Sequence, residues 1–147
     1  MISKKAKYAI NALVYLAKIP KNQPISVMTI AESQNIPLKF LENILAELKK
    51  AKIVDSKRGK YGGYFLNHRA EEIHMATIMR MFDGAIAILP CVTYRYYKKC
   101  EECEDEATCG IRQVAMEIRN ETVKRLKNAT LADIVKREKN LKEKKLF

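Results

Sequence analysis

The stretch from Ile36 to Leu66 constrains the fold of this chain more than any other. Two short strands are predicted over residues 53–56 and 63–66, joined by a basic turn that contains glycines. Before them, apolar residues recur at the i, i+3, i+4, i+7 spacing of a helix with one buried face: Leu38, Leu41, Ile44, Leu45 and Leu48. A helix followed by such a hairpin predicts a winged helix-turn-helix. In that motif the helix fits the major groove of DNA, and the hairpin tip reaches an adjacent groove or phosphate.

The rest of the chain is predicted to be largely helical. Ser3 and Ser26 are suited to cap two helices, over residues 3–18 and 27–34. Apolar spacing then indicates a short helix near residues 73–82, a long one over 110–127, and a last one opened by Thr130 with Asp133. The expected fold is mainly α: a winged helix-turn-helix domain with a two-stranded wing and a long C-terminal dimerisation helix.

The sequence divides into four parts. The C-terminal tail at 141–147 is too charged to have a buried core of its own, and we expect it to be frayed. The parts are a DNA-binding domain at 1–83, a cysteine-containing loop at 84–109, a dimerisation helix and terminal helix at 110–140, and a basic tail at 141–147.

The positive charge of the chain is unevenly distributed. The formal net charge is +11. Residues 1–69 carry 13 basic and 4 acidic side chains, whereas residues 70–147 carry 15 and 13. The excess therefore lies on the predicted winged half, where a polyanion such as DNA would bind. General basic character for solubility is the alternative explanation.

Candidate DNA contacts fall at three places in the predicted winged half. The N-terminal end of the helix after Pro37 is the part that usually meets base edges, where asparagine can read adenine and glutamate can accept from cytosine. At the wing, arginine suits a narrow minor groove, and glycines permit positive φ and close backbone approach. Lysines in the first turn of the first helix oppose its dipole, which makes sense beside a phosphate or as a solvated face. The candidates are Lys4, Lys7, Lys39, Glu42, Asn43, Arg58, Gly59, Lys60, Gly62 and Gly63.

All four cysteines lie in one segment, at Cys91, Cys100, Cys103 and Cys109. Soft thiolates gathered in one loop are what zinc or an iron-sulfur cluster requires, and Cys100-x-x-Cys103 has a familiar zinc spacing. Five carboxylates in the same loop should disfavour a bare thiolate unless a cation offsets them. A metal site is therefore expected, with a metal-free or thiol-switch state as the alternative.

Three stretches of the sequence resemble the IscR-type (Rrf-two) family of bacterial transcription regulators, whose members include iron-sulfur cluster and nitric oxide sensors. The similarity covers about residues 1–135 and rests on SKKAKYAINALVYLA, FLENILAELKKAKIV and SKRGKYGGYFL. It implies a homodimer that binds an inverted repeat in double-stranded DNA. It also implies that Glu42 discriminates between sites and that Arg58 contacts DNA.

The resemblance also bears on the cysteines. Family members that carry an iron-sulfur cluster use three cysteine ligands. Cys91, Cys103 and Cys109 match those three positions, and Cys100 is an additional cysteine. The family's histidine ligand is replaced here by Arg112, and the first helix offers lysines where some relatives have an acid. An all-cysteine site with a 2Fe-2S or 4Fe-4S cluster is implied, with zinc as an alternative. A regulator controlled by a protein or small-molecule effector, with structural or thiol cysteines, is the competing hypothesis.

The remaining patterns concern assembly and location. The long predicted helix has a narrow apolar seam, which favours homodimerisation over packing within one subunit. We expect a cytoplasmic protein without a membrane span, because no run of 18 apolar residues occurs. We do not expect an enzyme, since no Ser-His-Asp set, phosphate loop or His-rich metal motif appears. The seam residues are Ile111, Ala115, Ile118, Thr122 and Leu126.

Overall fold

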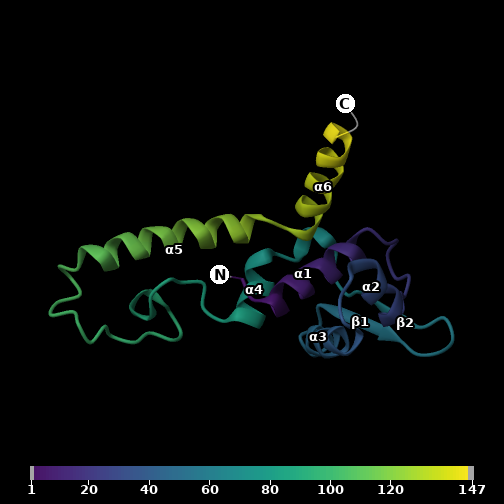
Figure 1. The fold of residues 1–147 in the computed structure, drawn as a ribbon, viewed down its shortest axis with the longest axis horizontal. Coiled ribbons are helices and arrows are strands. Elements are labelled where there is room, and N and C mark those ends of the chain that lie inside the picture. Colours follow the sequence, from purple (N-terminus) through teal and green to yellow (C-terminus); the bar gives the residue numbers. More distant parts are fainter. Residues whose placement is uncertain (1, 146–147) are drawn as a thin grey trace.

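The computed structural model describes residues 2–145 and has a mainly helical fold with one two-stranded sheet (Figure 1). The elements are α1 (Lys4–Ala17), α2 (Val27–Gln34), α3 (Leu38–Lys50), β1 (Val54–Lys57), β2 (Gly63–Leu66), the 3-10 turn η1 (Ala70–Glu72), α4 (Met75–Asp83), the 3-10 turn η2 (Pro90–Val92), α5 (Gly110–Asn128) and α6 (Leu131–Lys145). This confirms the predicted winged helix-turn-helix with its wing and long C-terminal helix.

The first two helices begin where the sequence predicted. The Ser3 hydroxyl accepts a hydrogen bond from the backbone N–H of Ala6 at 3.0 Å, and Ser26 accepts one from Thr29 at 3.1 Å. Each serine thus satisfies an N–H group that has no partner inside its helix. The caps therefore fix the first residues of α1 and α2.

The main core lies between α1, α2, α3 and the hairpin. The apolar face of α3 is fully buried there at Leu41, Ile44, Leu45 and Leu48, against Leu13 of α1 and Ile30 of α2. Burial of one such side chain contributes about 1.5–3 kcal/mol relative to leaving it exposed. The opposite face of α3 is left free for contacts outside the chain.

The wing is an antiparallel hairpin that is extended by a third segment. Val54 pairs with Leu66, and Lys57 pairs with Gly63. Ile25 and Tyr64 exchange two backbone hydrogen bonds, of 2.9 and 2.8 Å, so that the segment before α2 lies along β2. Tyr64 is half-buried and packs against the core.

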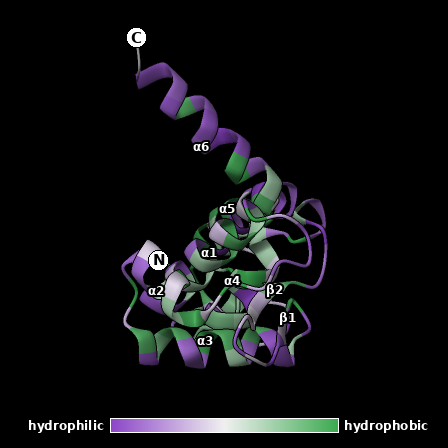
Figure 2. Cartoon of the chain, turned by 90° about the vertical axis from the view of Figure 1, so that its right-hand side faces the viewer, coloured by the Kyte–Doolittle hydropathy of each residue, from purple (hydrophilic) through white to green (hydrophobic). Residues whose placement is uncertain are grey.

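The two C-terminal helices take different positions in the molecule. α5 extends away from the winged half, and α6 projects on the side opposite α3 and the hairpin (Figures 1 and 2). The start of α6 nevertheless belongs to the main core, because Leu131 is fully buried there and its N–H donates to the Ile73 carbonyl at 3.0 Å. α6 is thus attached to the winged half, a contact the sequence did not predict.

The prediction of a frayed tail was wrong for residues 141–145. α6 continues to Lys145, five residues beyond its predicted end, and is mostly hydrophilic (Figure 2). Lysine, glutamate and leucine are strong helix formers, and Glu138–Lys142 and Lys139–Glu143 place opposite charges one turn apart. Residues 146–147 of the expected tail lie outside the described residues. Within residues 2–145, no helix is both long and apolar enough to cross a membrane.

Candidate nucleic-acid interface and cysteine centre

The N-terminal half of α3 presents three candidate DNA-contacting residues on its unburied face. The Lys39 side chain is 92% exposed, Asn43 is exposed, and Glu42 is half-buried. Lys39 Nζ lies 3.4 Å from a Glu42 carboxylate oxygen, one helical turn away. An exposed pair of this kind contributes little to stability, so both side chains can exchange this contact for one with DNA.

At the wing, Arg58 and Lys60 are exposed, as is the ring of Tyr61. Gly59 has a φ of +115°, which side chains with a Cβ rarely adopt. At Gly62 a Cβ would lie 2.2 Å from the Lys57 carbonyl oxygen, so a tight turn rather than positive φ requires glycine there. Tyr61 is an exposed aromatic ring at the tip, which the sequence analysis did not single out.

The lysines of the first helical turn divide into two groups. Lys4 and Lys7 are exposed and remain candidates for phosphate contact. Lys5 instead pairs with Glu47 of α3, at 2.6 Å between Nζ and Oε1, and lies 5.4 Å from the centre of the Phe82 ring. Lys49 likewise has a partner within the chain, the Ser56 hydroxyl at 2.6 Å.

The cysteine loop brings all four sulfur side chains to one cavity of about 360 Å³ beside the start of α5. Cys91 is buried against Val92 and Ala115, and the other three cysteines are half-buried. None of them forms a disulfide. Among residues 2–145, however, no three His, Cys, Asp or Glu side chains are close enough to hold a metal ion together.

The environments of three thiols differ. A hydrogen bond from the Cys100 thiol to Glu102, at 3.1 Å, raises the pKa of Cys100. Desolvation, followed by the interaction with Cys109, raises the pKa of Cys103. The pKa of Cys109 is instead lowered, chiefly because its sulfur accepts the backbone N–H of Arg112 at the start of α5. The expected effect of the carboxylates is therefore present at Cys100, through Glu102, whereas at Cys109 the backbone N–H groups at the start of α5 have the largest effect on the thiol pKa.

Arg112 lines the same cavity and carries a buried Nε without a hydrogen-bond partner among the described residues. Its Nη1 contacts the Met116 sulfur at 3.3 Å, which is a weak acceptor. A guanidinium held beside four cysteines would offset negative charge on thiolates or on a cysteine-ligated cluster.

Arg119 is a residue whose role the sequence analysis missed. Its side chain is only 8% exposed and holds η2 against α5. Its Nη1 donates to the Val92 carbonyl, and its Nη2 donates to the Tyr94 hydroxyl at 3.2 Å. Its position one turn after Ala115, on the same face, was the only sign in the sequence.

The predicted seam of α5 is also divided by the structure. Ala115 packs against the cysteine loop and is buried, whereas Ile111 is 75% exposed and Ile118 is 45% exposed. Val114, which was not in the predicted seam, is 55% exposed beside them. The exposed apolar stripe is therefore Ile111, Val114 and Ile118, and the inner face of α5 packs within the subunit.

Comparison with known protein families identifies the chain. The model of the Rrf2 family, described as an iron-dependent transcriptional regulator, matches residues 2–137. This chain belongs to the Rrf2 family. The resemblance stated from the sequence is thereby confirmed, and a DNA-binding transcriptional regulator is the function that the family shares.

Individual Rrf2 relatives cover most of the chain. An rrf2-like HTH-type transcriptional regulator of Rhodobacter capsulatus is 40% identical over 121 residues, which are 80% of this chain and 81% of that protein. The solved structure of CymR, the global cysteine regulator of B. subtilis, has a TM-score of 0.77 at 29% identity, covering 92% of this chain and 96% of CymR. T. potens IscR has a TM-score of 0.72 at 27% identity, covering 94% and 88%.

The chemistry of the donor set at this cavity suits a cysteine-ligated metal or cluster, but the side chains would have to move closer together to hold one. Four thiols line one cavity, and an unpaired guanidinium nitrogen is buried beside them. To ligate, Cys100 would exchange its hydrogen bond to Glu102 for a metal bond. Arg112 cannot replace the family's histidine as a ligand, because a guanidinium has no acceptor.

Proposed function

We propose that this Rrf2 protein is a homodimeric regulator that binds an inverted-repeat operator through α3 and the wing. The observation that supports this most strongly is that Asn43, Lys39 and Arg58 are exposed on adjoining elements while the opposite face of α3 is buried in the core. The excess of basic residues in 1–69 favours the same surface. A two-fold symmetric protein would recognise a two-fold symmetric site.

Within this proposal the residues have different roles. Asn43 and Glu42 read base edges in the major groove, and Arg58 enters the adjacent minor groove. Gly59, Gly62 and Gly63 let the backbone of the wing approach the duplex, and Lys60 meets phosphate. Lys4, Lys7 and Lys39 contribute contacts that position the protein without specifying sequence.

The DNA proposal is tested by replacing Arg58 with alanine. If Arg58 reads the minor groove, Arg58→Ala should weaken specific operator binding by about 1–3 kcal/mol, measured by fluorescence anisotropy against the operator and a scrambled duplex. If it contacts only phosphate, affinity should fall equally for both duplexes and the salt slope should decrease by about one. Arg137→Ala is the matched control, because it removes the same charge from exposed α6 on the far side of the molecule (Figure 1). Equal losses in the two variants would contradict the proposed interface.

We further propose that Cys91, Cys103 and Cys109, with Cys100 as the fourth ligand, hold an iron-sulfur cluster. When bound, the group would make the loop responsive to iron, oxidants or nitric oxide. The loop joins α4 of the winged half to α5, so a change in the loop could alter the separation of the two DNA-reading heads. Anaerobic purification followed by absorbance spectra and iron, sulfide and zinc assays tests this directly. Zinc without iron would favour a structural four-cysteine site instead.

A second candidate function is a thiol switch, favoured by the contact between Cys103 and Cys109 and the lowered pKa of Cys109. Hydrogen peroxide would take two electrons from the two thiols, forming one S–S bond and, with the two thiol protons, two water molecules. Mass spectrometry after peroxide treatment of metal-free protein would detect the linked peptides. Operator affinity that is the same for metal-loaded protein and for a Cys91→Ala, Cys103→Ala, Cys109→Ala variant would contradict cluster sensing.

A further inference from the structure

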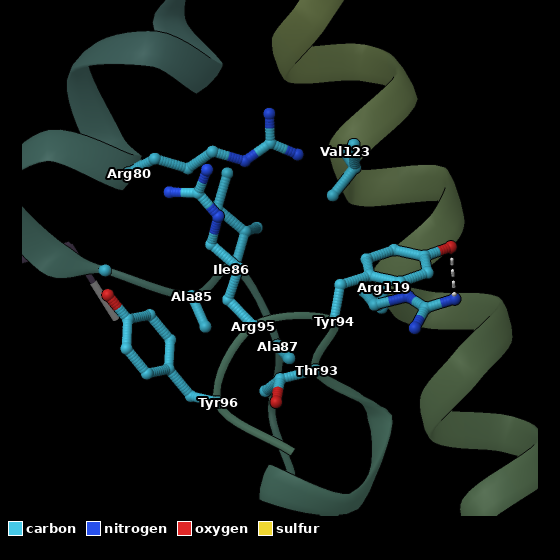
Figure 3. Close-up of a pocket in the computed structure, with 11 residues that line it drawn as sticks. Arg80, Ala85, Ile86, Ala87, Thr93, Tyr94, Arg95, Tyr96, Arg119 and Val123 are labelled. Carbon is cyan, nitrogen blue, oxygen red and sulfur yellow. Dashed lines mark hydrogen bonds between the residues drawn. The ribbon is translucent and has the colours of Figure 1, made fainter.

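A second cavity, separate from the cysteine cavity, lies between α4, the following loop and α5. Its volume is about 390 Å³, which is within the range of small-molecule sites. Arg80 of α4, Arg95 of the loop and Arg119 of α5 reach it from three different elements (Figure 3). Tyr94, Tyr96 and Val123 contribute to its walls.

The lining of this cavity carries positive charge without a counter-charge. No aspartate or glutamate lines it, and none of the three arginines takes part in an ion pair among residues 2–145. Three guanidiniums around one cavity repel one another unless an anion is present, since arginine stays protonated in proteins.

Arg119 makes this imbalance more costly because it is buried. Besides Val92 and Tyr94, its partner among the described residues is the side-chain oxygen of Asn120, which accepts from Nε at 3.0 Å and from Nη2 at 2.6 Å. The Tyr94 ring also lies over the guanidinium, 4.4 Å from its carbon to the ring centre. All these partners are neutral. The guanidinium of Arg119 therefore has hydrogen-bond acceptors but no negatively charged group beside it among the described residues. Buried charges in proteins are usually paired.

We propose that this cavity binds a small organic anion with a carboxylate or phosphate group. Arg80 and Arg95 are exposed and supply the charge-assisted hydrogen bonds, for which the planar guanidinium is well suited. The buried Arg119 adds positive electrostatic potential from the α5 side of the cavity. Ala85, Ile86 and Val123 form an apolar wall that accommodates a short carbon skeleton.

A ligand in this cavity would bridge three parts of the molecule that meet at its walls. It would contact α4 of the winged half, the start of the cysteine loop and the dimer-forming helix α5 at once. Such a ligand would favour one arrangement of the heads over others, and operator affinity would change with it. This regulatory consequence rests on the proposed DNA-binding function, whereas the binding site does not.

Isothermal titration calorimetry of the full chain without DNA tests the site. Citrate and inorganic phosphate are titrated separately at constant ionic strength, so that carboxylate and phosphate recognition are distinguished. We expect saturable binding of at least one probe, with one site per chain. The Arg80→Gln, Arg95→Gln double variant should bind about tenfold or more weakly, because two charge-assisted hydrogen bonds are lost.

The matched control is the Lys136→Gln, Lys139→Gln double variant, which removes two exposed positive charges from α6. It should bind the probe as the unmodified chain does, and circular dichroism should show all three proteins folded. Equal binding by the two double variants, or no saturable binding of either probe to the unmodified chain, would overturn the proposal. Failure to bind operator DNA would count only against the proposed function, because calorimetry is done without DNA.

Discussion

At the scale of single residues, glycine is required where another backbone segment lies too close to leave room for a Cβ. Gly63 has a φ of +152°, and a Cβ there would lie 2.2 Å from the carbonyl carbon and oxygen of Ile25. Those atoms belong to the segment that pairs with Tyr64, so they cannot move without breaking that pairing. Glycine at this position therefore allows the segment at Ile25 to pair with β2, and it also allows the backbone turn of the wing.

The substitution Gly63→Ala should lower the free energy of unfolding by about 1–3 kcal/mol, through strain and loss of the Ile25–Tyr64 pairing. Urea denaturation followed by circular dichroism measures the change. Gly110→Ala is the contrasting variant, since Gly110 lies in the first turn of α5 and a Cβ there would meet nothing within 4 Å. It should leave stability unchanged or raise it slightly. A loss no larger for Gly63→Ala than for Gly110→Ala would show that the close approach is not limiting.

At the scale of elements, hydrogen bonds from side-chain caps determine where helices begin. The start of α6 is held by Thr130 and Asp133, whose side chains each accept the other's backbone N–H, at 3.1 and 3.0 Å. These bonds direct Leu131 into the core of the winged half. Loss of the cap should therefore loosen both α6 and its attachment.

Thr130→Ala should cost about 1 kcal/mol of stability, as is typical for loss of an N-terminal cap. Asp133 adds a pH dependence. Hydrogen bonds from the Thr130 backbone and hydroxyl lower the pKa of Asp133, so its contribution is present above the unfolded pKa of about 4 and is lost as pH falls through the folded value. Thermal melts between pH 2.5 and 7, chosen to bracket that range, should show a smaller acid-side loss in Asp133→Ala than in the unmodified chain. Glu143→Ala, an exposed carboxyl in the same helix, should keep the original profile.

At the scale of the whole molecule, α5 leaves an apolar stripe uncovered within one chain. Ile111, Val114 and Ile118 lie on one face at 75%, 55% and 45% exposure. Contiguous apolar surface of this kind commonly marks a protein–protein contact. In the proposed homodimer, the stripe of one subunit would pack on that of its partner.

Ile118→Glu should shift the protein from dimer to monomer, because it would bury a charge at the centre of that contact. Sedimentation equilibrium gives the molar mass directly. Gln113→Glu adds the same charge to exposed surface elsewhere on α5 and should leave the dimer intact. An Ile118→Glu protein that remains dimeric would place the interface elsewhere. Operator affinity should fall with dimerisation, because each half-site would then be bound independently.

Features governed by neighbours in the chain could be predicted from the sequence. The Ser3 and Ser26 caps, the buried face of α3, the glycine-bearing wing and the grouping of cysteines follow from local hydrogen bonding, periodicity and composition, and they identified the family. Only the tertiary structure decided that Arg119 is buried, that Ala115 faces the cysteine loop, that Lys5 pairs with Glu47, and that Leu131 ties α6 to the winged half. Each of these depends on residues at least 23 positions away along the chain. No local pattern encodes such contacts, because they arise only when the folded chain brings distant segments together.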